Sequence, residues 1–199
     1  TASMDYSGSF AQEWQNEEKE DNNQKGRNRM IHFRMKNNIG SVTVADRILE
    51  MAALALAVFL VVLAVALYHY LPERIPVHFN SVGEADGWGG KGMIFMLSAL
   101  GVVAMAICSA AAYNYKMVNL PFSLNPACLS QQVTIIGRMM RVLSVLCGLL
   151  FIALMLMTTV PQWGMQSVFF SFFLIVMTSM TVVLIVYTVW IYKKGRQYR

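Results

Sequence analysis

The sequence predicts an all-α membrane protein: a four-helix transmembrane bundle with an ordered extracytoplasmic loop between the first and second helices. Two observations carry this prediction. Charged residues make up only 14% of the 199 residues, whereas soluble domains carry about 25%. In addition, four apolar stretches of about 20 residues follow one another, and each is long enough to cross a hydrocarbon core of ~30 Å.

Charge is distributed unevenly along the chain. Every acidic residue lies at or before Asp86, so the second half has no carboxylate with which to cover a water-exposed surface. The net charge of +5 is therefore attributed to membrane topology, and nucleic acid is not expected as a partner. The three cysteines, Cys108, Cys128 and Cys147, form neither a CxxC motif nor an even-numbered disulfide framework, and they are interpreted as small apolar filler.

The four spans have defined predicted bounds: residues 48–68, 93–113, 139–160 and 167–192. Asp46 is expected to cap the first span, because its carboxylate can accept hydrogen bonds from the free N–H groups of the first turn. Glu50 lies near the entrance of that span and reaches the headgroup level. Arg141 lies in the first turn of the third span, where it is expected to snorkel to the interface.

Two helix faces carry small or hydroxyl side chains. In the second span small residues share one face, which predicts close helix packing in lipid: Gly101, Ala104, Cys108 and Ala111. In the fourth span hydroxyls form a stripe: Ser171, Thr178, Thr181 and Thr188. These hydroxyls either bond to carbonyls of their own or a neighbouring helix, or line a polar path; both interpretations stay open.

Basic residues flank the spans asymmetrically. The amino-terminal tail, the 114–138 connection and the carboxyl-terminal tail carry unbalanced Lys and Arg, whereas the basic residues of the 69–92 loop are balanced by acidic ones. The positive-inside rule then places both termini and the 114–138 connection in the cytoplasm and the 69–92 loop outside. The 161–166 turn is short, so the third and fourth helices should be antiparallel neighbours.

Two tails flank the predicted membrane domain, which covers residues 48–192. Residues 1–47 are polar, lack apolar periodicity and are expected to form a disordered cytoplasmic tail. Met30 and Met35 both suit a natural start, so part of residues 1–34 is hypothesised to be upstream or added sequence. Residues 193–199 form a basic cytoplasmic tail.

The polar segment between the first two spans reads LPERIPVHFNSVGEADGWGGK from Leu71 to Lys91. Pro72 ends the first helix. IPVHFN follows a period of two, which predicts a short strand with Ile75, Val77 and Phe79 on one face and Pro76, His78 and Asn80 on the other. The glycines from Gly83 onward predict a turn-rich loop, which Trp88 is expected to anchor at the interface.

Three site hypotheses arise from this loop. His78, Glu84 and Asp86 have the atom types of a divalent metal site, which is the one cofactor that the sequence suggests. Alternatively the polar residues are structural, with an Asx-turn at Asp86, a turn capped by Asn80 and a His78 bond to a loop carbonyl. As a third possibility, the loop is an extracytoplasmic docking surface for a peptide or small amphiphile.

Lys91 is interpreted as an interface snorkeller or an ion-pair partner of Asp86. No serine or cysteine nucleophile motif accompanies His78, so no catalytic residue is assigned.

The segment also resembles a known family. Its pattern L-P-x-x-I-P-x-H-F-N-x-x-G-x-x-D-x-W, followed by Lys, is similar to the signature of a bacterial membrane domain of unknown function that occurs in SdpI, the immunity protein against the sporulation-delaying toxin. The matching residues are Leu71, Pro72, Ile75, Pro76, His78, Phe79, Asn80, Gly83, Asp86, Trp88 and Lys91.

The resemblance implies a multi-pass protein of the bacterial cytoplasmic (inner) membrane that acts in toxin resistance or signalling through binding at the outer face. The alternative is a metal-dependent membrane enzyme that uses His78, Glu84 and Asp86. A homo-oligomer remains open in either case.

Overall fold

The computed structural model describes residues 15–26, 42–159 and 166–198, and it divides into two units, residues 1–39 and 40–199. In the first unit, residues 15–26 form an exposed helix in which Lys25 Nζ lies 2.7 Å from Asp21 Oδ2. The polar composition of the amino-terminal tail predicts disorder for this segment. The helix differs from that expectation because this i,i+4 pair and the Glu and Lys side chains around it favour helix.

Some predictions concern residues outside the described part of the chain. They are the remainder of the amino-terminal tail, with Met30 and Met35, and most of the 161–166 turn.

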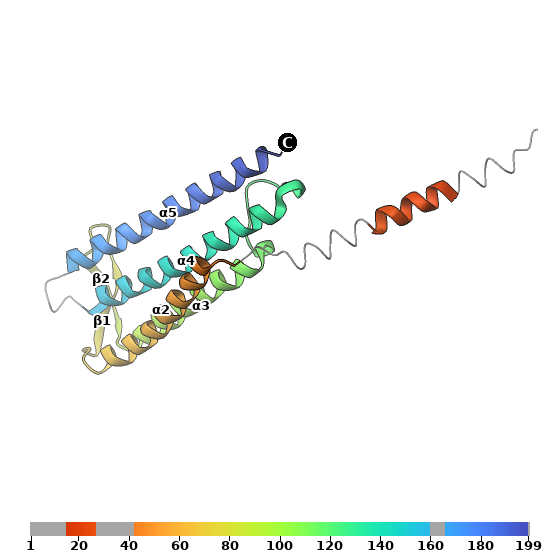
Figure 1. Ribbon diagram of the computed structural model, residues 1–199. Helices are drawn as coiled ribbons and strands as arrows, with labels where there is room; N and C mark the ends of the chain where they lie inside the picture. Colours follow the sequence, from red (N-terminus) through yellow and green to blue (C-terminus); the bar gives the residue numbers. More distant parts are fainter. Residues whose placement is uncertain (1–14, 27–41, 160–165, 199) are drawn as a thin grey trace, which may run out of the picture. The chain divides into compact units, whose positions relative to one another are not determined.

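In the second unit the described residues contain four helices that are long and apolar enough to cross a membrane. They are α2 (Val44–Tyr68), α3 (Met93–Tyr113), α4 (Leu129–Thr159) and α5 (Gln166–Arg196) (Figure 1). Two short 3₁₀ helices, η1 (Tyr115–Met117) and η2 (Pro126–Cys128), lie in the α3–α4 connection. The prediction of four spans is confirmed, and the second span has the predicted bounds.

The start of α2 differs in detail from the prediction. Thr43, not Asp46, is the N-cap residue. The Thr43 hydroxyl accepts a hydrogen bond from Asp46 N (3.3 Å), and Asp46 Oδ2 accepts one from Thr43 N (2.9 Å). This reciprocal capping box satisfies donors from both residues at once, which a cap by Asp46 alone would not do.

The helix α4 is the centre of the bundle, since it contacts α2, α3 and α5. Half of the residues in the most apolar stretch of α4 are buried. In α5, which packs mainly against α4, the buried share of the corresponding stretch is 6%. The small-residue face of α3 permits close packing at Gly101, as predicted. A Cβ there would lie 2.6 Å from Leu60 Cδ2 and 2.8 Å from Phe151 Cγ, so no larger residue fits without movement.

The antiparallel arrangement of α4 and α5 is confirmed by contacts between the start of one and the end of the other. The Gln132 side chain donates to the Ile191 carbonyl (3.1 Å). The helix α4 begins at Leu129 and not at Met139, because its first turns are held by such contacts with α5 and not by apolar character.

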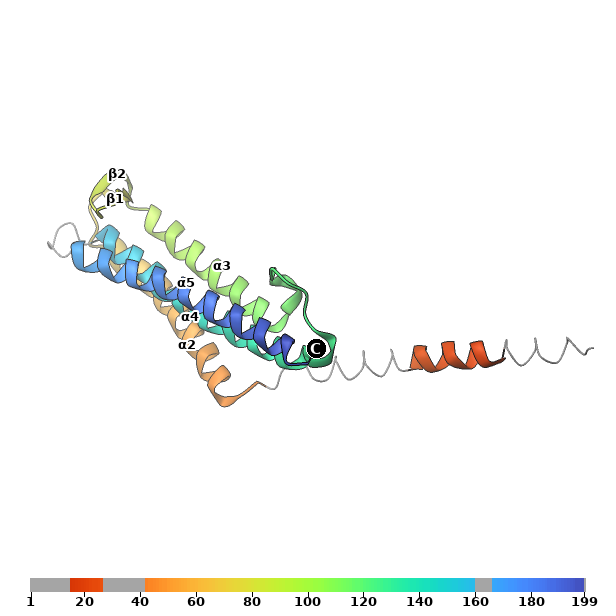
Figure 2. The same ribbon diagram turned by 90° about the horizontal axis from the view of Figure 1, so that it is seen from above.

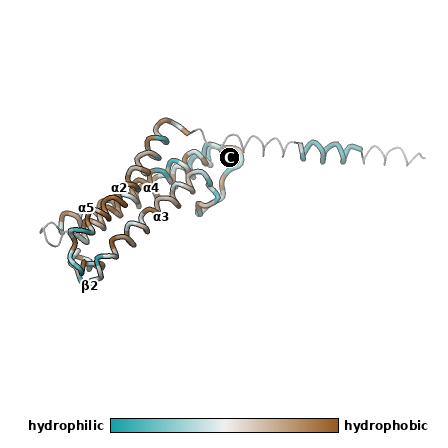
Figure 3. The backbone as a smooth tube through the Cα atoms, turned by 90° about the horizontal axis from the view of Figure 1, so that it is seen from below, coloured by the Kyte–Doolittle hydropathy of each residue, from teal (hydrophilic) through white to brown (hydrophobic). Residues whose placement is uncertain are grey.

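The helices are hydrophobic along their middle, and hydrophilic residues gather at the two ends of the bundle (Figure 3). Large side chains such as Met51, Leu54 and Ile175 are more than 60% exposed. Such a surface is unfavourable in water and suits lipid. The chain is therefore a multi-pass membrane protein.

The hydroxyls of α5 bond to their own helix. Ser171, Thr178 and Thr181 donate to carbonyls three or four residues earlier, at 2.8, 2.9 and 3.2 Å. The interpretation of these side chains as back-bonding groups is confirmed for these three residues, and a polar path is not needed to explain them.

Between α2 and α3 the chain forms an antiparallel hairpin of β1 (Arg74–Phe79) and β2 (Ala85–Gly90). It lies at the end of the bundle opposite to the carboxyl-terminal end of α5 (Figure 2). An all-α fold is therefore wrong in this detail, since the glycine-rich half predicted as loop is a strand. The period of two in β1 also fails: Ile75 and Pro76 are buried in succession and Val77 is exposed, because the register shifts between Pro76 and His78.

Candidate functional site

The hairpin holds every residue of the sequence motif from Ile75 to Trp88, and its glycines let the two strands meet. A Cβ on Gly87 would lie 2.8 Å from His78 Cβ, and one on Gly89 would lie 2.9 Å from Val77 Cγ1. By contrast, nothing lies within 4 Å of a Cβ on Gly90. The glycines at 87 and 89 thus provide the room that the β1 side chains occupy.

Asn80 organises the turn between the strands. Its Oδ1 accepts hydrogen bonds from the backbone N–H groups of Glu84 (2.9 Å) and Val82 (3.1 Å), and its own N–H donates to the Glu84 carbonyl (2.9 Å). The prediction that Asn80 caps this turn is confirmed. Such side-chain bonds replace the ladder where the chain reverses.

The tip of the hairpin rests on α5. Gly83 has a φ of +85°, which an L side chain rarely adopts. A Cβ at this position would lie 2.6 Å from Phe170 Cγ. The glycine of the motif is therefore required both for the backbone conformation and for contact with the α5 helix.

His78 and Asp86 form an exposed polar pair on the hairpin. Their Nδ1 and Oδ1 atoms are 2.5 Å apart, and the two side chains are 72% and 44% exposed. The predicted Asx-turn at Asp86 and the predicted His78 bond to a carbonyl are both replaced by this pair. A carboxylate oxygen accepts hydrogen bonds, so Asp86 Oδ1 can accept one from His78 Nδ1.

Lys91 closes the base of the hairpin. Its Nζ lies 2.8 Å from Glu73 Oε1 and 5.0 Å from the centre of the Tyr68 ring, and its N–H donates to the Glu73 carbonyl (3.0 Å). The hydrogen bond to Glu73 raises the pKa of the Lys91 ammonium. An ion pair between Lys91 and Asp86 is thus a wrong prediction, because Asp86 faces His78 instead.

The three residues of the metal hypothesis are not gathered at one point. Glu84 Oε2 accepts a hydrogen bond from Asn80 Nδ2 (3.2 Å), whereas Asp86 pairs with His78. Within residues 15–26, 42–159 and 166–198, no group of three or more His, Cys, Asp or Glu side chains lies close enough to hold a metal ion.

An apolar groove of about 110 Å³ runs beneath β1 along α3. It is lined by Ile75, Val77, Met93, Ile94, Met96, Leu97, Leu100 and Thr158. Val77 precedes His78 directly, so consecutive residues of β1 contribute to the groove and to the exposed polar pair. Trp88, 53% exposed, adds an aromatic side chain to this end.

A charged cluster that sequence reasoning missed lies at the other end of the bundle. Arg138 Nε donates to Asp46 Oδ1 (3.1 Å), and Arg141 Nε donates to Glu50 Oε1 (2.7 Å), which also accepts from the Tyr113 hydroxyl (2.5 Å). Arg141 is therefore paired inside the bundle and does not snorkel. The signal for this pairing is the spacing, since acids four apart and arginines three apart each share one helix face.

Part of the chain is similar to a known protein family. A family model described as "Domain of unknown function (DUF1648)" matches residues 55–102, which cover part of α2, the hairpin and the first half of α3. No curated protein and no solved structure matches the chain. The match supports a membrane domain of unknown function, centred on the hairpin.

Proposed function

We propose that the protein binds a peptide or small amphiphile at the β1–β2 hairpin, on the extracytoplasmic face of a bacterial cytoplasmic membrane. In this proposal it acts in toxin resistance or signalling, as the resemblance of the hairpin motif to SdpI-type immunity proteins implies. The proposal needs only a shaped and accessible surface on a membrane scaffold.

The observation that carries the proposal is that one hairpin contributes both an exposed polar pair and part of the lining of an apolar groove. The His78–Asp86 pair offers an exposed imidazole and an exposed carboxylate to a ligand's polar groups, and the groove lined by Ile75 and Val77 offers a surface for its apolar part. A ligand with both characters gains from burying apolar area while its polar groups stay hydrogen-bonded.

The Asn80 turn, the Lys91–Glu73 pair and the Gly83 contact with α5 hold the hairpin in one conformation. A surface that is ordered before binding loses less entropy when a ligand binds. This supports a recognition role for the hairpin over a role as a simple linker.

Growth of bacteria challenged with the sporulation-delaying toxin tests the proposal. Cells producing the wild-type protein should tolerate more toxin than cells without it, and His78→Ala or Asp86→Ala should remove at least about tenfold of that protection, equivalent to ~1.4 kcal/mol of binding. His69→Ala is the matched control, since His69 is exposed at the end of α2 and lies outside the pair. Protection that survives both hairpin substitutions would contradict the proposal.

The same proteins distinguish the binding module from the alternative function, a metal-dependent enzyme. Stoichiometric divalent metal in the purified wild-type protein, lost in His78→Ala, would favour the enzyme. Protection that persists after treatment with a chelator would favour the binding module.

A further inference from the structure

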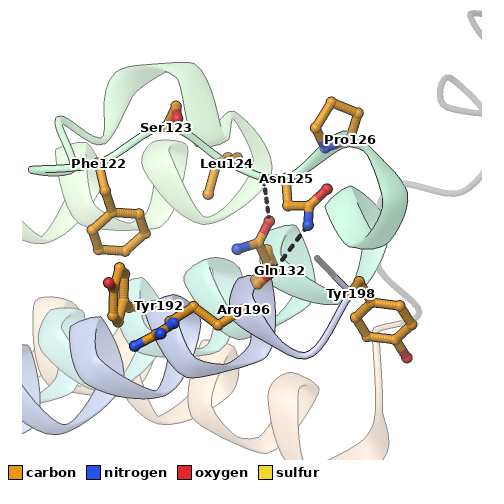
Figure 4. A pocket seen from close by; sticks show the side chains of 10 residues that line it. Phe122, Ser123, Leu124, Asn125, Pro126, Gln132, Tyr192, Arg196 and Tyr198 are labelled. Carbon is orange, nitrogen blue, oxygen red and sulfur yellow. Dashed lines mark hydrogen bonds between the residues drawn. The ribbon is translucent and has the colours of Figure 1, made fainter.

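A second pocket lies at the end of the bundle opposite to the hairpin, between the α3–α4 connection and the last turns of α5 (Figure 4). Its volume is about 250 Å³. It is lined by Phe122, Ser123, Leu124, Asn125, Pro126, Gln132, Tyr192, Gly195, Arg196 and Tyr198. Neither the motif nor the proposed function involves these residues.

The floor of this pocket is built from polar side chains, Gln132, which is buried, and Asn125, which is half-buried. Gln132 is 1% exposed; its Oε1 accepts from Asn125 N (2.9 Å) and its Nε2 donates to the Ile191 carbonyl (3.1 Å). Asn125 Nδ2 donates to the Gly195 carbonyl (2.8 Å). A Cβ on Gly195 would lie 2.7 Å from Gln132 Nε2, so the glycine lets α5 approach this floor.

The wall of the pocket carries the cationic side chain of Arg196. The Arg196 guanidinium lies 6.0 Å from the centre of the Tyr192 ring, which meets the Phe122 ring edge-on at 5.4 Å (Figure 4). No ion pair in the described part of the chain includes Arg196, and the sequence has no acidic residue after Asp86. An anion from outside the chain would therefore complement this site.

Further positive charge lies at the rim of the pocket. Lys193 and Lys194 in the same turn of α5 add positive charge. This charge favours a phosphate over a neutral group.

An apolar hollow adjoins the polar pocket on the flank of α5. Val189, Tyr192, Lys193, Arg196 and Gln197 line it, so Tyr192 and Arg196 belong to both. Val189 is 46% exposed and Ile185 is 59% exposed, and they continue this flank toward the apolar middle of the helix. A ligand held at Arg196 can thus extend an apolar chain along α5.

We infer that this pocket binds an anionic phospholipid of the surrounding bilayer, with the phosphate at Arg196 and an acyl chain along the flank past Tyr192 and Val189. The size agrees, because sites for whole small molecules measure about 300–1,000 Å³, and 250 Å³ suits a headgroup alone. Basic pockets beside transmembrane helices are suited to such headgroups. A zwitterionic lipid would bring an ammonium group that has no carboxylate to meet.

The test uses the full chain in nanodiscs of phosphatidylcholine with increasing phosphatidylglycerol, and native mass spectrometry counts the lipids retained. The wild-type protein should retain phosphatidylglycerol at least about fivefold over phosphatidylcholine, and Arg196→Gln should abolish the preference. Arg196→Lys should keep part of it, because Lys provides the charge without the bidentate fork.

Lys116→Gln is the matched control, since Lys116 is exposed in η1, lies outside the pocket and loses the same charge. It should retain the wild-type preference. An equal loss in Lys116→Gln and Arg196→Gln would contradict the proposal and indicate a general charge effect, as would an unchanged preference in Arg196→Gln. Thermal stabilisation by inorganic phosphate in pure phosphatidylcholine, at constant ionic strength, would assign the site to free phosphate and overturn the lipid proposal.

Discussion

At the scale of single residues, the end of the bundle opposite to the hairpin is held together by two pairs between α2 and α4. Arg141 is 6% exposed, whereas the Glu50 side chain with which it pairs is 30% exposed. Losing one partner of a buried pair costs about 3–5 kcal/mol, because the remaining charge is left without compensation. The cost depends on which charge is left, since water reaches the Glu50 carboxylate more easily than the Arg141 guanidinium.

We therefore predict that Glu50→Leu destabilises the protein more than Arg141→Met does. Glu50→Leu should lower the free energy of unfolding in mixed detergent–SDS micelles by about 3–5 kcal/mol, and Arg141→Met should cost less, because Tyr113 still donates to the carboxylate. The double variant Glu50→Leu/Arg141→Met should recover most of the loss of Glu50→Leu. Additive losses in the double variant would show that the two residues do not act as a pair.

At the scale of elements, close approach at glycine determines both the hairpin and the helix packing. In the hairpin, β2 alternates between exposed and half-buried positions as a strand should, although its composition, ADGWGG, has low strand propensity. The two strands pair in spite of this low propensity, because Gly87 and Gly89 leave room for the β1 side chains. In the bundle, Gly101 has the same role between α3 and its neighbours.

For the hairpin, we predict that Gly87→Ala disturbs strand pairing without unfolding the bundle. The added methyl group would meet His78 Cβ at 2.8 Å, so β2 must move away from β1. Amide hydrogen exchange of residues 74–90 should accelerate by about tenfold, or ~1.4 kcal/mol. Gly90→Ala, with open space around its Cβ, should leave the exchange near the wild-type rate, and equal acceleration in both variants would contradict the explanation.

For the bundle, we predict that Gly101→Ala lowers the free energy of unfolding by about 1–3 kcal/mol, the usual cost of overpacking a core. The methyl group would be placed between Leu60 and Phe151. Gly92→Ala, at the N-cap of α3 with nothing near its Cβ, serves as the control for the loss of a glycine. Thermal unfolding in detergent measures both, and an unchanged midpoint for Gly101→Ala would show that the helices are not in close contact there.

At the scale of the whole molecule, the four spans can be predicted from the sequence, whereas the contacts that join them cannot. The spans are predictable because long apolar runs are needed to cross a bilayer. The early start of α4 is not predictable, since the polar Gln132 interrupts the apolar pattern. In the structure its side chain forms hydrogen bonds with the Asn125 and Ile191 backbones. A polar residue inside a helix is satisfied there by tertiary contacts that no local pattern reveals.

The candidate site, too, can be predicted only in part from the sequence. The motif residues and the turn at Asn80 are predictable because turn chemistry is local. The partners of Asp86 and Lys91 are not, because the register shifts in the hairpin decide which side chains face one another. A shift of one residue changes the face on which every later side chain lies.

The proposed function requires that the hairpin faces the outside of the cell, with the carboxyl-terminal end of α5 in the cytoplasm. Cysteine labelling with a membrane-impermeant maleimide tests it most directly, with Val82→Cys in the hairpin turn and Tyr198→Cys after α5, positions that are 67% and 47% exposed. The parent chain gives the background from the native cysteines. In intact cells Val82→Cys should be labelled and Tyr198→Cys protected until the membrane is permeabilised; the reverse pattern would contradict the account.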